Sequence, residues 1–158
     1  MKIALGADCD GFDLKQAVKE YLLAHGHTVE DLGVDTGGDE APYYRIALQV
    51  AKQVTDLKVE RGILCCGTGM GMAIVANKAP GIYAAVCETI HAAEKARSIN
   101  NANVLALGGM FTTPVLAAEI VETWLQTEFT QGWQPSTQTW LENSLKDIAE
   151  LEVQQFNL

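Results

Sequence analysis

Residues 61–78 read Arg61-Gly-Ile-Leu-Cys-Cys-Gly-Thr-Gly-Met-Gly-Met-Ala-Ile-Val-Ala-Asn-Lys78, and this stretch decides the fold. An apolar run from Gly62 to Cys65 ends abruptly at Cys66. Three glycines then fall within the five positions 67–71, and small, helix-compatible residues continue to Asn77. A short apolar run that ends in a glycine-rich turn before a helical segment is typical of a strand–loop–helix unit. The stretch therefore predicts an α/β fold.

The turn at residues 66–71 also carries candidate chemistry. Its glycines let the backbone approach a ligand closely and point N–H groups toward it. A cysteine at the start of a helix lies in an electropositive setting that stabilises a thiolate. A Cys66 thiolate there could take a proton from carbon, while the backbone donors stabilise the oxyanion that forms. The alternative is a tight turn that holds a small buried cysteine for packing alone.

Strand and helix patterns alternate along the rest of the chain. Apolar runs predict strands at Ile3–Ala7, Thr28–Leu32, Gly62–Cys65, Ile82–Val86 and Val104–Leu107. Helical patterns cover Phe12–Leu23, Tyr43–Val54, Thr89–Ile99, a segment opened by Thr113-Pro114, and about 137–155, and Gly33–Pro42 is predicted to be a loop. This order predicts a three-layer Rossmann or flavodoxin-like fold, with a five-stranded parallel sheet and helices on both faces. Without repeats or linkers, we expect residues 1–158 to form a single domain.

Composition narrows the class of partner. The net charge is −9 and no basic cluster occurs, so nucleic acid and anionic membrane surfaces are excluded as expected partners. The four cysteines show neither metal-ligand nor disulfide-scaffold spacing, and we expect no metal. The first residues pass directly into a strand pattern, and no apolar run approaches the length of a membrane span. These patterns predict a reduced, cytoplasmic protein without a signal peptide.

The predicted sheet brings three segments to one edge. In a doubly wound parallel sheet, ligands bind beyond the carboxyl ends of the strands. We therefore expect Asp8–Asp10, Cys66–Gly71 and Cys87–Glu88 to meet there. A carboxylate, a thiol and backbone donors that converge can form an acid–base site. Asp8 could move protons or anchor a hydroxyl in it, or it could simply cap the helix that follows.

Six segments carry a family resemblance. They are Lys2-Ile-Ala-Leu-Gly-Ala-Asp8, Gly62-Ile-Leu-Cys-Cys-Gly-Thr-Gly-Met-Gly-Met72, Ala76-Asn-Lys78, Gly81-Ile82, Ala96-Arg97 and Asn101-Ala-Asn-Val-Leu105. In this order they resemble the family of ribose-5-phosphate isomerase B and galactose-6-phosphate isomerase. The similarity runs from residue 1 to about Phe129, and the Cys-Gly-Thr-Gly-x-Gly block is highly specific in that context.

The resemblance implies an aldose–ketose isomerase that works without a metal, nucleotide or other cofactor. The cysteine that matches Cys66 would move a proton between C1 and C2 of the open-chain sugar, through a cis-enediolate. The Thr68 position would hold the developing oxyanion, and the Asp8 position would contact substrate hydroxyls and help to move their protons. Such chemistry needs a suitable base and preorganised donors where negative charge develops. The implied substrate-binding backbone comprises Gly67, Gly69, Met70 and Gly71.

The resemblance also implies a site that lies between two subunits. A homodimer or a dimer of dimers is expected, with a small-molecule sugar or sugar phosphate as substrate. Asn100 belongs to a segment that matches one lining the pocket, and Cys9 adjoins the Asp8 position. We expect the helix at about 137–155 to lie at the subunit interface.

Four departures from the family pattern bear on the substrate. Cys9 stands where ribose-5-phosphate isomerases have a histidine, and Ile99 stands where a ring-opening histidine is common. Met110 replaces an expected arginine segment, and Trp133-Gln134-Pro135 replaces an arginine-rich tail. Because a phosphate is usually held by several charge-assisted hydrogen bonds, a standard ribose-5-phosphate isomerase is not expected.

Two readings of substrate binding stay open. The substrate could be a small sugar or sugar acid, unphosphorylated or too short to close a ring, so that no ring-opening histidine is needed. Alternatively, replacement anchors could come from Arg45, Lys78, Arg97 or His91. His91 either touches the ligand or is an ordinary exposed residue at a helix end. Arg97 either binds the ligand or pairs with an acid on its own helix.

Three functional hypotheses follow. The first, which we favour, is a competent isomerase with an altered substrate, in which Cys66, Thr68 and Asp8 are catalytic. The second is a non-catalytic or half-site subunit of a heteromeric enzyme like galactose-6-phosphate isomerase, against which the intact cysteine block argues. The third is a nucleotide-binding module, but the G-x-G-x-x-G spacing is missing after the first predicted strand.

Overall fold

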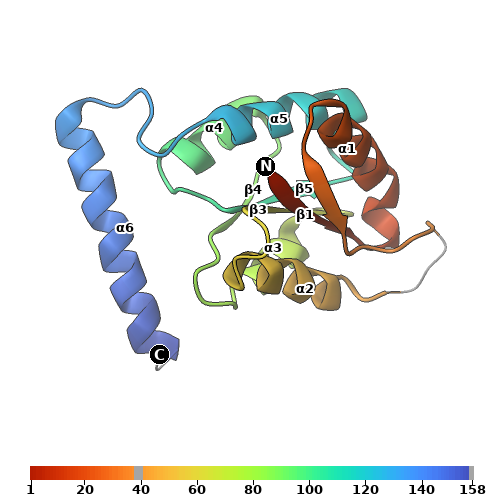
Figure 1. Cartoon of the computed structure of the whole chain (residues 1–158), viewed down its shortest axis with the longest axis horizontal. Helices are drawn as coiled ribbons and strands as arrows, with labels where there is room; N and C mark the ends of the chain where they lie inside the picture. Colours follow the sequence, from red (N-terminus) through yellow and green to blue (C-terminus); the bar gives the residue numbers. More distant parts are fainter. Residues whose placement is uncertain (38–40, 157–158) are drawn as a thin grey trace.

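A computed structural model describes residues 1–37 and 41–156 of the chain (Figure 1). Its strands are β1 (Lys2–Ala7), β2 (Thr28–Asp31), β3 (Arg61–Cys66), β4 (Ala84–Val86) and β5 (Val104–Gly108). They form one parallel sheet in the order β2-β1-β3-β5-β4. The predicted five-stranded parallel sheet is confirmed. Residues 38–40 of the predicted loop Gly33–Pro42 lie outside the described residues.

Helices cover both faces of this sheet. They are α1 (Phe12–Ala24), α2 (Tyr43–Thr55), α3 (Met70–Ala76), α4 (Ile90–Ser98), α5 (Pro114–Gln126) and α6 (Pro135–Phe156), and a 3₁₀ turn, Cys9–Gly11, precedes α1. In Figure 1, α1, α4 and α5 lie on one side of the sheet, and α2 and α3 lie on the other. The predicted three-layer arrangement is therefore confirmed.

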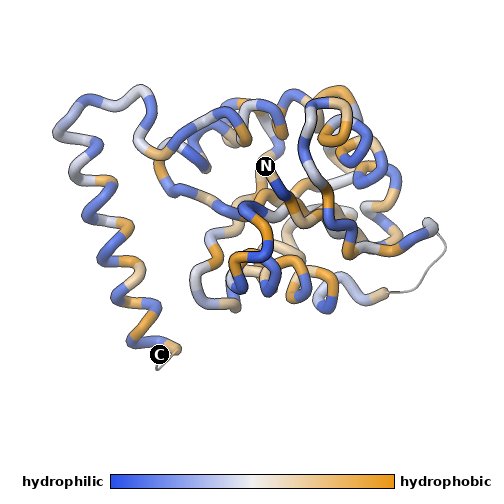
Figure 2. The backbone as a smooth tube through the Cα atoms, in the orientation of Figure 1, coloured by the Kyte–Doolittle hydropathy of each residue, from blue (hydrophilic) through white to orange (hydrophobic). Residues whose placement is uncertain are grey.

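Two separate hydrophobic cores hold the layers together. Side chains of successive strand residues point to opposite faces of a sheet, so β1, β3, β4 and β5 each contribute to both cores. Cys65 packs in the core under α1, α4 and α5, whereas Cys66 packs in the core under α2 and α3. The apolar residues of the strands gather at the centre of the molecule in Figure 2. Cys65 and Cys66 therefore point to opposite faces of the sheet.

Strand β4 is shorter than predicted, because two asparagines hold the chain before it. The side chain of Asn77 accepts a hydrogen bond from the N–H of Ala84 at 2.7 Å and donates one to the carbonyl oxygen of Ala84 at 2.9 Å. The side chain of Asn103 accepts from the N–H of Tyr83 and donates to the carbonyl oxygen of Gly81. The segment predicted as a strand from Ile82 therefore enters the sheet only at Ala84.

A buried lysine fixes the end of β2. The side chain of Lys15, in α1, is fully buried, and its Nζ lies 3.0 Å from Oδ1 of Asp31 and 2.6 Å from the carbonyl oxygen of Val34. Lys19, one turn further along α1, binds Oδ2 of the same Asp31 at 2.9 Å. Burial raises the pKa of Asp31, but the hydrogen bonds from Lys19 and Lys15 outweigh it and hold that pKa below its ordinary value.

Helix α6 extends away from the rest of the chain (Figure 1). It spans residues close to the predicted 137–155, and Leu141 is its only buried residue within the described part. Glu152 accepts a hydrogen bond from the N–H of Gly81 at 2.8 Å. Apolar residues recur along the helix (Figure 2), and those with exposed side chains include Trp140, Ile148, Leu151 and Phe156. No helix in residues 1–37 and 41–156 is long and apolar enough to cross a membrane.

Candidate active site

The candidate site lies where the chain direction across the sheet reverses. From β1 the chain passes to β2 at one edge, and from β3 it passes toward β4 at the other. Ligands bind at such switch points, beyond the carboxyl ends of the strands. In the pairing of β1 with β3, Ala7 lies opposite Cys65, so Asp8 and Cys66 are the next residues on neighbouring strands. The predicted convergence of these two residues follows directly from this register.

Three loops are packed tightly against one another at this edge. A Cβ on Gly11 would lie 2.2 Å from the carbonyl oxygen of Cys65, so only glycine allows this approach. In the loop after β5, the N–H of Gly109 donates to the carbonyl oxygen of Cys66 at 2.8 Å, and the N–H of Met110 donates to that of Gly67 at 2.9 Å. The backbone next to Cys66 is therefore fixed from both sides.

Cys66 is the last residue of β3, and it is 5% exposed. The N–H of Gly69 donates to its Sγ at 3.1 Å. Gly69 has a φ of 75°, a left-handed conformation that glycine adopts freely and that turns this N–H back toward the sulfur. A backbone N–H donor is therefore held in hydrogen-bonding distance of the Cys66 sulfur.

The other buried cysteines have a different environment. Burial raises the pKa of the Cys65 thiol strongly, and the neighbouring Cys66 adds to the rise. Burial also raises the pKa of Cys87, at the end of β4, to about 11. Both groups are therefore neutral, inert thiols at physiological pH. Cys87 does lie at the carboxyl ends of the strands, as predicted, but its side chain is a buried packing residue.

Asp8 was expected either to move protons or to cap the helix that follows it. Its Oδ1 accepts the N–H of Gly11 at 3.0 Å, so it caps the 3₁₀ turn before α1. The residue is buried, and burial raises the pKa of its carboxyl above the ordinary value despite the lowering effect of the Gly11 hydrogen bond. The capping role is confirmed, and the proton-transfer role stays a prediction.

Asp8→Asn separates these two roles. The amide oxygen can keep the cap, so we expect equal or higher thermal stability at pH 7 and a proton-exchange rate about 100-fold lower. The sign follows from linkage: a carboxyl whose pKa is raised by folding disfavours the folded state above the unfolded pKa, near 3.8, and that penalty disappears as the pH falls below it. The stability gain should therefore be present at pH 7 and absent near pH 3.5 in thermal scans.

Asp13→Asn is the matched control, because Asp13 is an exposed acid in the first turn of α1. It should leave the exchange rate unchanged. If Asp8→Asn instead loses stability at pH 7 and keeps its activity, Asp8 is a structural cap alone.

Thr68 and Met70 form the turn that follows Cys66. The N–H of Met70 donates to the Oγ1 of Thr68 at 3.3 Å, and α3 begins at Met70. Gly71 lies in the first turn of α3, where a Cβ would come within 2.9 Å of the ring of Tyr43. The predicted contacts of these residues with substrate stay predictions.

Sequence reasoning missed Tyr43 near the turn, and it noted Met110 only as a departure from the family pattern. Tyr43 begins α2 and packs on Gly71, while Met110 and Asp10, which was predicted to reach this edge, both lie close to where a Cβ on Gly67 would stand. Helix α2 follows a strand, and so its first residues belong to the same edge of the sheet as Cys66. That topology could have indicated Tyr43 from the sequence, because it is the first aromatic residue of the helix.

His91 and Arg97, both predicted to bind substrate, occupy different surroundings. His91 is strongly exposed in the first turn of α4, with Nδ1 at 3.4 Å from Oε2 of Glu94. Arg97 is buried and donates to the carbonyl oxygens of Thr127 and Ala102 and to Oδ1 of Asn101. Burial lowers the pKa of Arg97 to about 10, with a further contribution from Arg61. These contacts favour a structural role for Arg97, which ties α4 to the chain after α5.

Asn100 lies at the opposite edge of the sheet from Cys66. It follows α4 and precedes β5, whose first residue pairs with the beginning of β3. Its exposed side chain lines a pocket of about 360 Å³ together with Tyr83 and Leu145. Cys9, by contrast, is an exposed free thiol directly after Asp8. Within one chain, the structure therefore brings Cys9 to the Cys66 edge and leaves Asn100 away from it.

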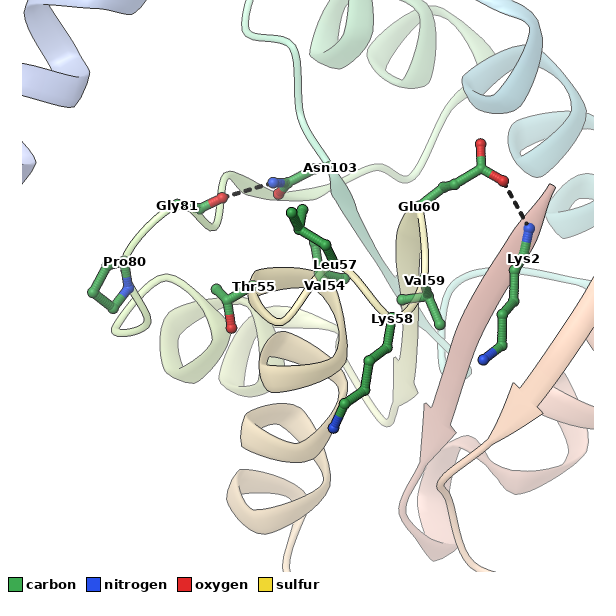
Figure 3. A pocket seen from close by; sticks show the side chains of 10 residues that line it. All are labelled: Lys2, Val54, Thr55, Leu57, Lys58, Val59, Glu60, Pro80, Gly81 and Asn103. Carbon is green, nitrogen blue, oxygen red and sulfur yellow. Dashed lines mark hydrogen bonds between the residues drawn. The ribbon is translucent and has the colours of Figure 1, made fainter.

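A pocket of about 450 Å³ also opens at this opposite edge (Figure 3). It lies between the end of α2, the start of β3 and the Pro80-Gly81 turn, and Leu57 and Lys58 line it. Its side-chain amide, Asn103, is already bonded to Gly81. None of the residues around Cys66 lines this pocket. Elsewhere in the described chain, no group of three or more His, Cys, Asp or Glu side chains could hold a metal ion.

Comparison with known proteins places this arrangement in a family. The family model described as Ribose/Galactose Isomerase matches residues 3–139. The chain is 42% identical over 152 residues to 4-deoxy-4-sulfo-D-erythrose isomerase of Clostridium sp. (strain MSTE9), covering 96% of both chains. It is 46% identical over 132 residues to D-erythrulose-4-phosphate isomerase of Pectobacterium atrosepticum, covering 84% of this chain and 87% of that one.

A solved structure agrees over the whole fold. Ribose-5-phosphate isomerase B of Clostridium thermocellum superimposes with a TM-score of 0.89 at 38% identity, covering 98% of this chain and 99% of that one. The sequence resemblance, the strand order and the cysteine–glycine turn point the same way. The chain belongs to the ribose and galactose isomerase family and is an aldose–ketose isomerase.

Proposed function

We propose that this isomerase interconverts a four-carbon aldose and its ketose, with an anionic group on C4. In such a sugar the C4 oxygen is esterified or replaced, so no hydroxyl is placed to close a five-membered ring onto C1. The substrate stays open-chain and needs no residue to open a ring. Cys9 and Ile99, which occupy the positions of the two expected histidines, carry this proposal.

The names of two relatives support the size of the substrate. One is named for 4-deoxy-4-sulfo-D-erythrose and the other for D-erythrulose 4-phosphate. Both compounds have four carbons and an anionic group at C4. Both proteins are more than 40% identical to this chain over most of its length.

Cys66 is the base in the proposed reaction. Its thiolate takes the proton from C2 of the aldose, the electrons of that bond form the C1–C2 double bond, and the negative charge moves onto O1. Protonation of C1 by the same thiol then gives the ketose. The Gly69 N–H, 3.1 Å from the sulfur, stabilises the thiolate before and after the transfer.

Asp8 and Thr68 assist the oxygen chemistry. While the carbon proton moves from C2 to C1, a hydroxyl proton must move from O2 to O1. Asp8 can do this because its raised pKa brings the carboxyl closer to accepting a proton near neutral pH. The Thr68 hydroxyl and the backbone N–H groups of the glycine turn are assigned the role of holding the enediolate oxygens.

A second copy of the chain would complete the site. Asn100 lies at the opposite edge of the sheet from Cys66 and cannot reach Cys66 of its own chain. In a dimer, the Asn100 side chain of a second copy could line the Cys66 site instead. Helices α2 and α3, beside the site, carry exposed apolar side chains that a second subunit could cover. They are Tyr44, Leu48, Met70 and Ile74. The exposed apolar residues of α6 would extend that interface. We propose a homodimer or dimer of dimers in the cytoplasm, where the four free cysteines stay reduced.

Solvent-deuterium incorporation tests the proposed substrate. Wild type and Cys66→Ala are incubated in D₂O with four-, five- and six-carbon aldoses and their terminal phosphates, and exchange is followed by NMR. We expect exchange at C1 and C2 for D-erythrose 4-phosphate above all, and none with the variant. A preference for ribose 5-phosphate would contradict the four-carbon proposal. Exchange that persists in Cys66→Ala would contradict the assigned base.

A lack of exchange with every sugar would support the half-site alternative. In that case, the chain would need a related partner subunit, and activity should appear on co-expression with one. Analytical ultracentrifugation of the chain alone gives the accompanying assembly state. A stable homodimer that exchanges the proton contradicts the half-site reading.

A further inference from the structure

Met110 lies over the residue that follows the catalytic cysteine. Its N–H donates to the carbonyl oxygen of Gly67 at 2.9 Å, and the preceding Gly109 N–H binds that of Cys66. Its Cε lies 3.1 Å from where a Cβ on Gly67 would stand. The backbone position of Met110 is therefore fixed, while 68% of the residue remains exposed to the space beside the turn.

Asp10 approaches the same point from the loop after β1. Its Cβ and Oδ2 lie 3.5 and 3.7 Å from that Cβ position on Gly67. An apolar methyl end and a carboxylate thus both lie close to Gly67, on the side where its Cβ would stand. The methyl end offers no hydrogen bond to a sugar hydroxyl, and the carboxylate repels an anionic group. A substrate chain that extended along Gly67 would meet both.

We propose that Met110, supported by Asp10, is the specificity-determining residue that limits the length of the substrate chain at this side of the site. This inference rests on the proposed four-carbon substrate and names the side chain that selects it. In this proposal, an additional hydroxymethyl unit that extended past Gly67 would meet the Met110 methyl group, whose Cε lies 3.1 Å from the Gly67 Cβ position. Discrimination by one such unit in an apolar setting is worth about 10- to 200-fold.

Binding of unreactive analogues tests this directly. Calorimetry compares 4-phospho-D-erythronate with 5-phospho-D-ribonate, which carry a carboxylate in place of the aldehyde. We expect wild type to prefer the four-carbon acid, and Met110→Ala to shift the ratio of the two dissociation constants at least about tenfold toward the five-carbon acid. Met110→Leu, which conserves most of the volume, should restore the wild-type ratio.

Phe111→Ala is the matched control, since Phe111 is an exposed apolar neighbour on the same loop. It should leave the ratio unchanged. An unchanged ratio in Met110→Ala, with wild-type circular dichroism and a measurable affinity for the four-carbon acid, overturns the role of Met110 and leaves the proposed function standing. A wild type that binds the five-carbon acid more tightly overturns both, as does one that binds neither.

Discussion

Cys66→Ser is expected to lower the rate of proton exchange by about 10³-fold while leaving the fold intact. The serine hydroxyl can accept the Gly69 N–H in place of the thiol, so the turn should keep its shape. A hydroxyl is, however, a far weaker acid than a thiol, and almost none is ionised at neutral pH. General-base catalysis contributes about 10²–10⁴-fold, which sets the size of the loss. Deuterium exchange and thermal scans on the same preparation measure the two quantities.

Cys65→Ser provides the matched control one residue earlier. Cys65 is fully buried in the other core, so a hydroxyl there costs about 1–3 kcal/mol if it finds no partner. We expect a melting temperature several degrees lower and an exchange rate per folded molecule close to that of wild type. Equal losses of exchange in both variants, at unchanged stability, would contradict the assignment of the base to Cys66 alone.

Lys15→Met is expected to lower the free energy of unfolding by about 3 kcal/mol. The methionine fits the space of the lysine stem, but Asp31 loses a buried cationic partner and the Val34 carbonyl loses its donor. Removal of one member of a buried ion pair costs about 3–5 kcal/mol, and the remaining Lys19 contact places this case at the lower end. Urea unfolding at pH 7 measures the change.

Lys19→Met removes the other cation from the same carboxylate. The Lys19 side chain is 35% exposed, compared with 0% for Lys15, so the loss should stay below about 1 kcal/mol. Because the pKa of Asp31 is lowered by folding, its stabilisation is present above the unfolded pKa and is lost as the pH falls through the folded one. The difference between the two variants should therefore shrink in acid. Equal losses at pH 7 would contradict the importance of burial.

Much of the fold could be predicted from local patterns. The five predicted strands are parallel strands of one sheet, of which β1, β3 and β5 are largely buried. Side-chain alternation along β3 places Cys65 and Cys66 in different cores. The predicted start of β4 was wrong by two residues, because the side-chain amides of Asn77 and Asn103 bond the backbone at Ala84 and Tyr83. Such contacts leave no periodic trace in the sequence. The extended path of α6 could not be predicted either, because an amphipathic pattern does not show which surface will cover the apolar face of the helix.

The site shows the same division. Asp8, Cys66 and the glycine turn could be placed together because they end neighbouring parallel strands. Asp10 was expected at this edge with the rest of the loop after β1. The approach of Met110 to Gly67, from the loop after β5, arises from tertiary packing that no spacing in the sequence predicts. Arg97 was a candidate to bind the substrate. Its guanidinium instead bonds the main-chain oxygens of Ala102 and Thr127 and the side chain of Asn101.

The asparagine that bonds Ala84 also bears on the solubility of the protein. Strand β4 is at the edge of the sheet, and an open edge invites another chain to add itself as a further strand. Asn77 occupies both the N–H and the carbonyl oxygen of Ala84 that would receive such a strand. An added strand must first displace these two hydrogen bonds. The Asn77 side chain therefore disfavours edge-to-edge aggregation at the high protein concentrations of a cell.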